Sequence, residues 1–283
     1  MPLKEYRAKR NFAVSPEPQG AAKPKPRKTR ELFFCVQKHL ASHLHYDFRL
    51  EHDGVLLSWA VPKGPSLDPT VKRLAMKVED HPIEYGDFEG VIPDGYGMGI
   101  VMLWDHGSWE PLVDDVDAAL KKGDLKLRLN GVKLKGSWAL IRTAGGDGRS
   151  WLLLKHRDEW AGPLDIAVFA PLSVKSGGDL TDIVAAEAPA LWQSHRSAKA
   201  SGAGLMKIVE KAVALKAERE AQAGTPADAG PTVNSAIKRK SAAAKKSSTK
   251  AASTTRSTPR TRAATGRAAR SPAAKSRPRS PRS

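Results

Sequence analysis

The densest cluster of reactive side chains lies in residues 37–51, which read QKHLASHLHYDFRLE. In the second half of this segment apolar residues alternate with His45, Asp47 and Arg49, so a strand here would carry these three on one face. Same-face neighbours lie about 7 Å apart at Cα, which lets an imidazole and a carboxylate converge on one divalent cation. His39, just before the strand, could supply a third ligand. The pattern predicts a metal site with a guanidinium beside it.

This ligand set suits a phosphate-handling metal. Two imidazoles and one carboxylate leave coordination positions open, and mixed nitrogen and oxygen ligands fit Mn²⁺, Fe²⁺, Co²⁺ or Zn²⁺. A metal beside Arg49 can hold a phosphate and polarise its oxygens. A second alternating segment, residues 73–81, places four polar side chains at one parity: Arg73, Lys77, Glu79 and His81. His81, and Tyr85 four residues later, could donate hydrogen bonds to a phosphoryl oxygen or protonate a leaving group.

Two other interpretations of these residues stay open. One is an ordinary solvated strand face, although such a face would more often carry Lys, Thr, Ser and Glu than histidines. The other is the His-x-Asp and distal His arrangement of Fe(II) oxygenases, with His81 as the distal ligand. The sequence suggests no 2-oxoacid site, whereas Arg49, Lys63 and Arg73 all suit phosphate.

The elements that must position these residues are short strands. Within residues 32–155, apolar or alternating runs are separated by turn residues every 8 to 15 positions, which is typical of an antiparallel β domain. Turns are expected at residues 52–54, 95–99 and 105–107, and Asn130-Gly131 predicts a type I′ hairpin. About eight or nine strands with local connections favour a single closed barrel, because closure removes exposed edges.

The barrel interior is expected to be aromatic, with one short helix attached. The helix is predicted over residues 116–122, with Asp114 or Asp115 at its start and Gly123 at its end. Cys35 lies in an apolar run and should be a buried, inert thiol, and a single cysteine excludes a disulfide framework and a multi-thiolate zinc site. Five tryptophans are expected in the core: Trp59, Trp104, Trp109, Trp138 and Trp151.

The net charge of +17 comes from the two ends of the chain. Residues 1–30 carry nine basic and two acidic side chains, and residues 231–283 carry fifteen basic and none acidic, which leaves 23 basic against 28 acidic between them. A mildly acidic body with two cationic arms follows, and such arms bind polyanions or stay solvated. We therefore expect a mobile basic arm over residues 1–30, a folded domain over 31–160 and a disordered tail over 225–283.

The segment between the domain and the tail, residues 161–224, fits no single pattern. Apolar residues at helical spacing predict an amphipathic helix over residues 205–222. The chain has no run of 18 apolar residues, and its first 30 residues lack the apolar stretch of a signal peptide. Together with the lone cysteine, these features favour a cytoplasmic location without membrane contact. We further expect a nucleoid-associated monomer of bacterial or archaeal type.

The motifs over residues 33–155 resemble the 3′-phosphoesterase module of bacterial DNA ligase D and its free-standing relatives. The matching pieces are QKHxASxLHYDFRLE at 37–51, SWAVPKGPS at 58–66, RLA at 73–75 and EDHPxxYxxFEG at 79–90. They agree in order, spacing and identity over less than half of the chain. The resemblance implies a β-barrel with an apolar interior and an active site on its outer surface.

The resemblance also implies an activity. Members act, typically with Mn²⁺, on DNA or primer-template 3′ ends, removing a terminal ribonucleoside and then the 3′-phosphate to leave a 3′-OH. It assigns the metal to His39, His45 and Asp47, and the scissile phosphate to Arg49, His81 and Tyr85. It names six supporting residues: Arg10, Glu17, Gln37, Lys63, Arg73 and Glu79. Co²⁺ or Zn²⁺ could replace Mn²⁺, and a ligase or polymerase of non-homologous end joining is the implied protein partner.

Two departures from the family pattern bear on activity. Asn11 stands where an Asp is usual, and residues 92–97 are one residue shorter than the common form. If these changes have ended turnover, the protein would be a non-catalytic DNA-binding scaffold. The basic tail lies outside the resemblance and resembles a linker-histone tail, so we expect it to tether the protein to DNA without reading sequence.

Overall fold

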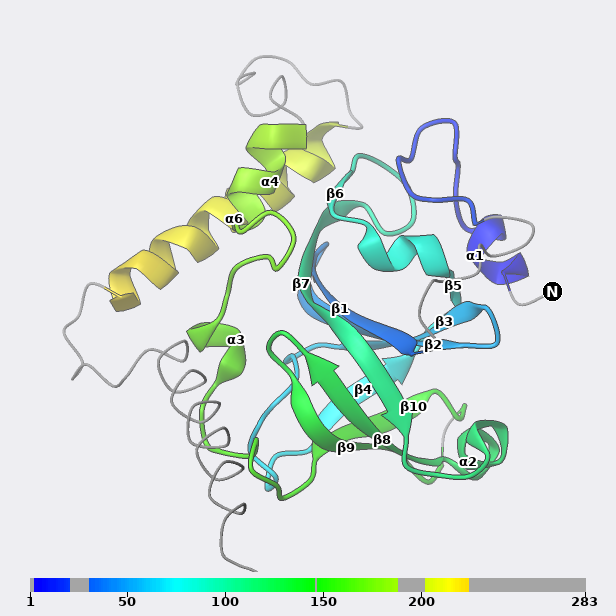
Figure 1. Ribbon diagram of the computed structural model, residues 1–283. Coiled ribbons are helices and arrows are strands. Elements are labelled where there is room, and N and C mark those ends of the chain that lie inside the picture. Colours follow the sequence, from blue (N-terminus) through cyan, green and yellow to red (C-terminus); the bar gives the residue numbers. More distant parts are fainter. Residues whose placement is uncertain (1–2, 21–30, 146, 188–201, 224–283) are drawn as a thin grey trace, which may run out of the picture. The chain divides into compact units, whose positions relative to one another are not determined.

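The computed structural model describes residues 3–20, 31–145, 147–187 and 202–223 (Figure 1). The chain divides into two units, Met1–Thr225 and Pro226–Ser283, and all of the described residues lie in the first. The predicted tail over residues 225–283 lies outside the described residues, and so do residues 1–2 and 21–30 of the predicted arm.

The described strands form one antiparallel sheet that closes into a barrel (Figure 1). The ring runs β1-β2-β3-β4-β10-β9-β8-β7 and closes where β7 pairs with β1. The two remaining strands, β5 and β6, pair with β3 and β7. The strands are β1 Leu32–Leu40, β2 Leu44–His52, β3 Val55–Val61, β4 Arg73–Lys77, β5 His81–Pro82, β6 Gly90–Ile92, β7 Gly99–Pro111, β8 Asp124–Gly131, β9 Lys135–Arg142 and β10 Ser150–Lys155. The predicted closed barrel is confirmed.

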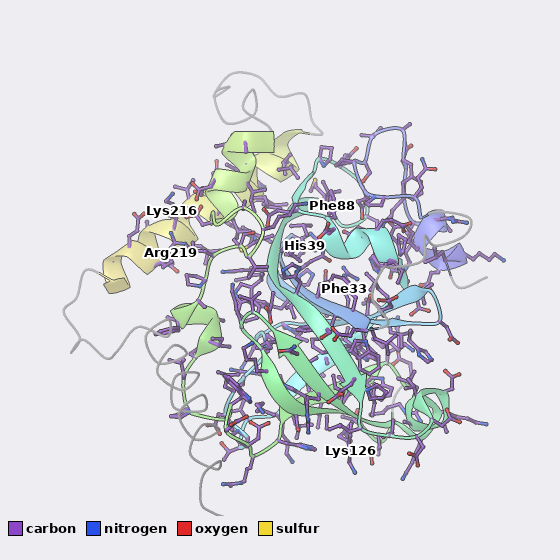
Figure 2. All side chains as sticks on the ribbon, in the orientation of Figure 1. Phe33, His39, Phe88, Lys126, Lys216 and Arg219 are labelled. Carbon is purple, nitrogen blue, oxygen red and sulfur yellow. The ribbon has the colours of Figure 1, made fainter. Side chains whose placement is uncertain are left out.

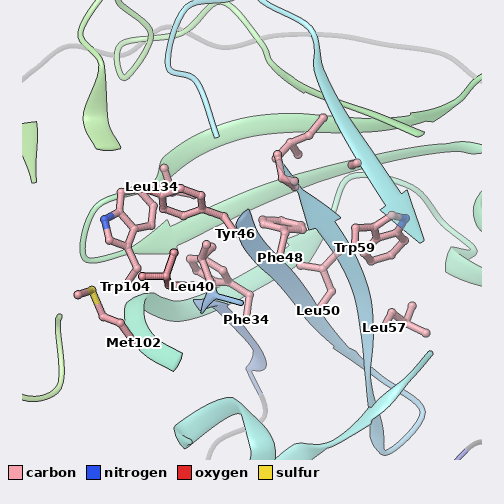
Figure 3. Close-up of a cluster of buried hydrophobic side chains, with 14 of the residues drawn as sticks. Phe34, Leu40, Tyr46, Phe48, Leu50, Leu57, Trp59, Met102, Trp104 and Leu134 are labelled. Carbon is pink, nitrogen blue, oxygen red and sulfur yellow. The ribbon is translucent and has the colours of Figure 1, made fainter. Parts of the chain in front are cut away.

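Large aromatic side chains fill the barrel, as predicted (Figure 3). The rings of Tyr46 and Trp104 meet edge to face with centroids 5.3 Å apart, and those of Trp59 and Trp151 do so at 5.9 Å. All five tryptophans expected in the core are buried, and so is Cys35. Each fully buried side chain of this size contributes roughly 1.5–3 kcal/mol through burial, so the interior holds the strands in place.

Short helices and one long helix flank the barrel. They are α1 Lys4–Ala8, the 3₁₀ turn η1 Ile83–Asp87, α2 Val116–Lys122, α3 Ile166–Phe169, α4 Leu180–Glu187 and α6 Gly202–Ala223. The helix predicted over residues 116–122 is confirmed: the Asp115 carboxylate caps it by accepting the N–H of Ala118, and Gly123 ends it at φ 84°. None of the helices in the described ranges has the length and apolarity needed to cross a membrane.

One predicted turn is a continuous strand in the structure. Residues 105–107 lie in the middle of β7 and pair with β1, where Cys35 opposes His106 and Phe34 opposes Gly107. The glycine is needed for a different reason, because a Cβ on Gly107 would lie 2.2 Å from the carbonyl oxygen of Asn130 on β8. Gly107, which was interpreted as a turn residue, is therefore a position where two neighbouring strands approach closely.

The predicted hairpin around Asn130-Gly131 is confirmed, because β8 pairs antiparallel with β9, but its two-residue turn is wrong. Asn130 pairs with Lys135, and the N–H of Gly131 donates to the carbonyl of Leu134, so the turn spans residues 131–134. The buried Asp105 carboxylate accepts the N–H groups of Lys133 at 2.9 Å and Leu134 at 2.8 Å. This contact comes from the neighbouring strand β7, which is distant only in sequence, and it stabilises the longer turn. By contrast, the turn at residues 52–54 is confirmed, with positive φ at Asp53 and Gly54.

Residues 3–20, expected to belong to a mobile arm, pack on the barrel instead. The side chain of Tyr6 in α1 is fully buried, and its hydroxyl donates to the carbonyl of Pro18 at 2.6 Å. Its ring lies 5.0 Å from the imidazole of His81 and 6.0 Å from the ring of Tyr85. Burial of the Tyr6 ring holds this segment on the barrel, although its basic composition predicted a mobile arm.

Helix α6 packs its apolar side on the barrel and on α4. It includes the range over which the sequence predicts an amphipathic helix, residues 205–222. Its buried residues recur at helical spacing and join the main core: Leu205, Ile208, Val209 and Ala212.

Candidate metal and phosphate site

The candidate site lies on the outer face of β1, β2 and β3. On β2 the residues Tyr46, Phe48 and Leu50 point into the core, so His45, Asp47 and Arg49 point outward. The antiparallel register places His39 of β1 opposite His45, Gln37 opposite Asp47, and Ser58 of β3 opposite Arg49. Alternation and register together gather these polar side chains, and the predicted outer-surface location is confirmed.

The three predicted metal ligands come together. The Nδ1 atom of His39 and the Nε2 atom of His45 each lie 3.7 Å from an oxygen of Asp47, and the imidazole centroids are 4.8 Å apart. One ligand atom from each residue falls within 4.8 Å of the other two. This spacing suits three ligands around one ion.

Two backbone carbonyls fix which nitrogen of each imidazole faces Asp47. The Nε2–H of His39 donates to the carbonyl of Gly97, and the Nδ1–H of His45 donates to that of His43, each at 3.0 Å. A carbonyl only accepts, so both far nitrogens carry a proton, and in the neutral form of each imidazole the near nitrogen carries a lone pair. Three acceptors therefore face one another, and a cation is what such a set requires.

The charges of these groups favour metal binding. Burial opposes ionisation of Asp47, but the Arg49 guanidinium and the two imidazoles outweigh it and hold the pKa of Asp47 well below its usual range. Burial lowers the pKa of His45, against the opposing effect of Asp47. At neutral pH the carboxylate is therefore charged and His45 is neutral, as ligation of a divalent cation requires.

The guanidinium of Arg49 is held from three sides. It donates from Nη2 to Asp47 at 2.9 Å, from Nε to the side-chain oxygen of Gln37 at 2.7 Å and from Nη1 to the Ser58 hydroxyl at 2.8 Å. The Gln37 amide in turn donates to the carbonyls of Tyr85 and Phe88 at 2.9 and 2.8 Å. Sequence reasoning missed Ser58, although its place opposite Arg49 in a strand pair was the available signal. A guanidinium fixed beside the metal ligands can bind an oxyanion such as a phosphate oxygen.

His81 also enters the site, but in a different state from the predicted one. Its Nδ1–H donates to the carbonyl of Glu79 at 2.9 Å, so its Nε2 accepts from Arg10 Nη2 at 3.1 Å. Burial, with Arg49 and Arg10 nearby, lowers the pKa of His81 well below its usual value. The imidazole is therefore neutral and accepts a hydrogen bond, rather than being charged and ready to donate one to a phosphate.

The packed N-terminal segment supplies two of the supporting residues. Arg10 donates from Nε to Glu17 at 2.8 Å and from Nη1 to Glu79 at 3.1 Å, and its guanidinium carbon lies 3.9 Å from the Tyr6 ring centroid. Burial opposes ionisation of Glu79, and hydrogen bonds from its own backbone N–H and from Arg10 and Lys9 bring the net pKa below the usual value. The structure thus brings Arg10, Glu17 and Glu79 together beside His81.

These groups surround a cavity of about 350 Å³. Tyr85 lines it, with its ring 4.9 Å from the guanidinium carbon of Arg49. Tyr96 lines it as well and was missed, because the run around it was interpreted only as a turn. That turn is confirmed by the N–H of Met98 donating to Gly95. Figure 2 shows His39 and Phe88 among the side chains of the described residues.

Three of the predicted supporting residues do not line this cavity. Gln37 is fully buried and acts on the cavity only through its hydrogen bond with Arg49. Lys63 is exposed beyond the end of β3, and Arg73 lies on β4. The predicted shared face of Arg73 and His81 is wrong, because Ala75 is buried in the core while Leu74 is 46% exposed. The chain leaves β4 after Lys77 and pairs again only at β5, so one alternation does not run through residues 73–81.

Asn11, one of the two departures from the family pattern, is exposed and does not line the cavity. Its side-chain oxygen accepts the N–H of Ala13 at 3.1 Å, a turn that Asp would form equally well.

His81 does not join the group of metal ligands, so the oxygenase interpretation with His81 as a ligand does not fit the geometry.

Residues 37–142 match the family described as the DNA ligase D 3′-phosphoesterase domain, which confirms the resemblance. A multifunctional non-homologous end joining protein LigD from Pseudomonas aeruginosa is 58% identical over 166 residues, which cover 58% of this chain and 20% of the relative.

A LigD protein with a similar description from Mycobacterium tuberculosis is 42% identical over 160 residues, covering 56% of this chain and 20% of the relative. One from Mycolicibacterium smegmatis is 41% identical over 182 residues, covering 62% and 23%. The chain therefore spans about a fifth of the length of these relatives.

Proposed function

We propose that this chain is a metal-dependent phosphoesterase that heals DNA 3′ ends during strand-break repair. It removes a 3′-terminal ribonucleoside and a 3′-phosphate and leaves a 3′-OH. The family match supports the phosphoesterase class, and the names of the relatives support a place in non-homologous end joining. The observation that carries the proposal is the set of three acceptors, from His39, His45 and Asp47, beside the fixed guanidinium of Arg49.

The donor set favours a hard or borderline divalent metal. Neutral imidazoles and a carboxylate suit Mn²⁺, with Co²⁺ and Zn²⁺ as alternatives, and no thiolate lies among the described ligands. When bound, such a metal supplies positive charge to a phosphate oxygen and lowers the pKa of a water molecule. His39, His45 and Asp47 would hold it.

The protein's own residues position and neutralise the phosphate. Arg49 binds a phosphate oxygen through an N–H not engaged by its three partners, and its rigid mounting sets the orientation. Arg10 adds a second guanidinium next to His81. Neutral His81 can accept a proton as the doubly charged 3′-phosphate arrives, because the added negative charge favours the imidazolium form. Tyr85 closes the side of the cavity next to Arg49 and His81.

Partners follow from the substrate class. The site would take DNA 3′ ends and primer-templates, and a ligase or polymerase would use the 3′-OH product. We propose that the fifteen basic residues of 231–283 hold the protein on DNA in the nucleoid without reading sequence. Such tethering raises the local concentration of the site near strand ends.

The test is cleavage of a primer-template that carries a 3′-phosphate or a single 3′-ribonucleotide, with Mn²⁺ present. The wild-type chain should release the phosphate and the nucleoside, chelator should stop both reactions, and His45→Ala should lower the rates by at least about a hundredfold. Inert wild-type protein that still binds Mn²⁺ and DNA would instead favour the non-catalytic scaffold.

A further inference from the structure

The turn between β1 and β2 is held from outside by helix α6. The Nζ of Lys211 donates to the carbonyl of Ser42 at 2.7 Å. The next carbonyl along the chain, that of His43, orients the imidazole of His45. A shallow cavity of about 320 Å³ runs between this turn and Lys211, Ala214, Leu215 and Glu218 of the helix.

The N-terminal end of the same helix contacts the residue next to the second orienting carbonyl. Gly204 lies against the side chain of Met98, so that a Cβ on Gly204 would come within 2.8 Å of the Met98 methyl carbon. Met98 directly follows Gly97, whose carbonyl orients the imidazole of His39. One helix therefore contacts a residue next to each of the two carbonyls that set the direction of the ligand imidazoles.

Helix α6 is itself firmly anchored. Its buried residues join the barrel core, with no more than 5% of any of these side chains exposed: Leu205, Ile208, Val209 and Ala212. Near its other end, Arg219 and Lys216 lie 2.8 and 3.4 Å from the carboxylate of Asp179, which precedes α4. A helix fixed at both ends can hold the turn it contacts in one position.

We infer that α6 is a positioning element for the metal site and that Lys211 is its principal positioning residue. The helix lies outside residues 37–142, the part that matches the family of domains. The inference rests on the proposed metal site. The metal binds most tightly when both imidazoles already point at its position, because no further free energy is then needed to orient them. Loss of the Lys211 contact frees the turn at residues 41–43 and with it His45.

The experiment compares three variants of the full chain. Lys211→Met keeps the aliphatic stem and removes the donor, Lys211→Arg restores a donor, and Lys207→Met is the control. Lys207 is exposed one turn earlier on the same helix, and its side chain makes no hydrogen bond or ion pair with the described residues. The Mn²⁺ dissociation constant is measured by magnetic resonance of free Mn²⁺, and the thermal unfolding midpoint is measured alongside.

Lys211→Met should weaken Mn²⁺ binding about three- to tenfold, less than loss of a direct partner of a ligand, with a midpoint within about 2 °C of wild type. Lys211→Arg should restore most of the affinity, and Lys207→Met should match wild type. Saturating Mn²⁺ should return the cleavage rate of Lys211→Met to the wild-type value. Equal affinities for wild type and Lys211→Met, or an equal loss in Lys207→Met, would overturn the inference.

Failure of the inference is distinguishable from failure of the proposed function. If His45→Ala binds Mn²⁺ as tightly as wild type, the metal site itself is wrong. If His45→Ala loses binding while Lys211→Met keeps it, only the role of α6 is refuted. Met98→Ala tests the second contact and should add about a further twofold loss of affinity when combined with Lys211→Met. No added loss in the double variant would restrict positioning to the Lys211 end and contradict the two-contact inference.

Discussion

The ionised pair of Asp47 and Arg49 is the chemical centre of the site, and its geometry depends on neutral neighbours. Gln37 and Ser58 leave the guanidinium little freedom to rotate. Asp47 is 7% exposed and Arg49 is 2% exposed, so each charge depends on its partners rather than on water. Small changes among these neighbours should therefore alter phosphate binding.

Ser58→Ala should raise the KM for a 3′-phosphate substrate about tenfold and leave Mn²⁺ affinity within about twofold. The substitution removes one acceptor from Arg49 and leaves a buried N–H unpaired, which costs about 1–3 kcal/mol. Steady-state kinetics and Mn²⁺ titration provide the two measurements. Ser108→Ala, on β7 away from the site, is the matched control. A tenfold loss of metal affinity in Ser58→Ala would show that Ser58 acts on the ligands and not on Arg49.

The depressed pKa of His81 predicts a pH dependence of stability. In the unfolded chain this group has its ordinary pKa near 6.5, while native His81 stays neutral well below that value. Below about pH 6.5 the unfolded state therefore binds a proton that the native state excludes, and the free energy of unfolding falls as pH is lowered, by up to about 1.4 kcal/mol per pH unit. Denaturant titrations from pH 7 to 5 should show this slope. His81→Asn should flatten it, and an unchanged slope would refute the assignment.

Most of the strands were predictable because they carry apolar or alternating runs, and several tight turns carry a local signal. Local signals of this kind are the helix-capping residues Asp115 and Gly123, which lie at the ends of α2, and the turn residues 52–54. The turn at residues 131–134 was missed because the group that stabilises it, Asp105, lies on another strand. The packing of residues 3–20 was missed because it depends on the burial of one residue, Tyr6.

Asp105→Ala should lower the free energy of unfolding by about 2–3 kcal/mol, because two backbone N–H groups lose a buried acceptor. Urea denaturation followed by tryptophan fluorescence measures this change. The control is Asp147→Ala, since Asp147 is exposed and contacts only the nearby Arg149 among the described residues. A stability within about 0.5 kcal/mol of wild type for Asp105→Ala would contradict the role given to this carboxylate.

At the scale of the molecule, chemistry and charge occupy different parts of the sequence. Residue types and spacing predicted the ligand set on β1 and β2, and the resemblance added Arg10 and Glu17, which pack beside Glu79. Sequence could not show that Lys211 of α6 contacts Ser42, 169 residues away, in the turn between the two ligand-bearing strands. Contacts between residues so far apart in sequence depend on the closure of the barrel, and no local sequence pattern predicts them.

Deletion of the chain after Gly224 should flatten the salt dependence of DNA binding. If about half of the fifteen tail charges neutralise phosphates, the slope of log K against log salt is about −6 with the tail, and it should become much shallower without it. Turnover of a short saturating substrate should remain within about twofold. Binding titrations at 50 to 200 mM salt measure the slope, and equal slopes for both chains would refute tethering.

The most direct test of the central claim is anomalous diffraction at the manganese edge from crystals of the full chain grown with Mn²⁺. We expect one peak between β1 and β2, about 2.0–2.3 Å from His39 Nδ1, His45 Nε2 and an oxygen of Asp47, with Arg49 beside it. The absence of a peak there at saturating Mn²⁺, or a peak bound by other residues, would contradict the account.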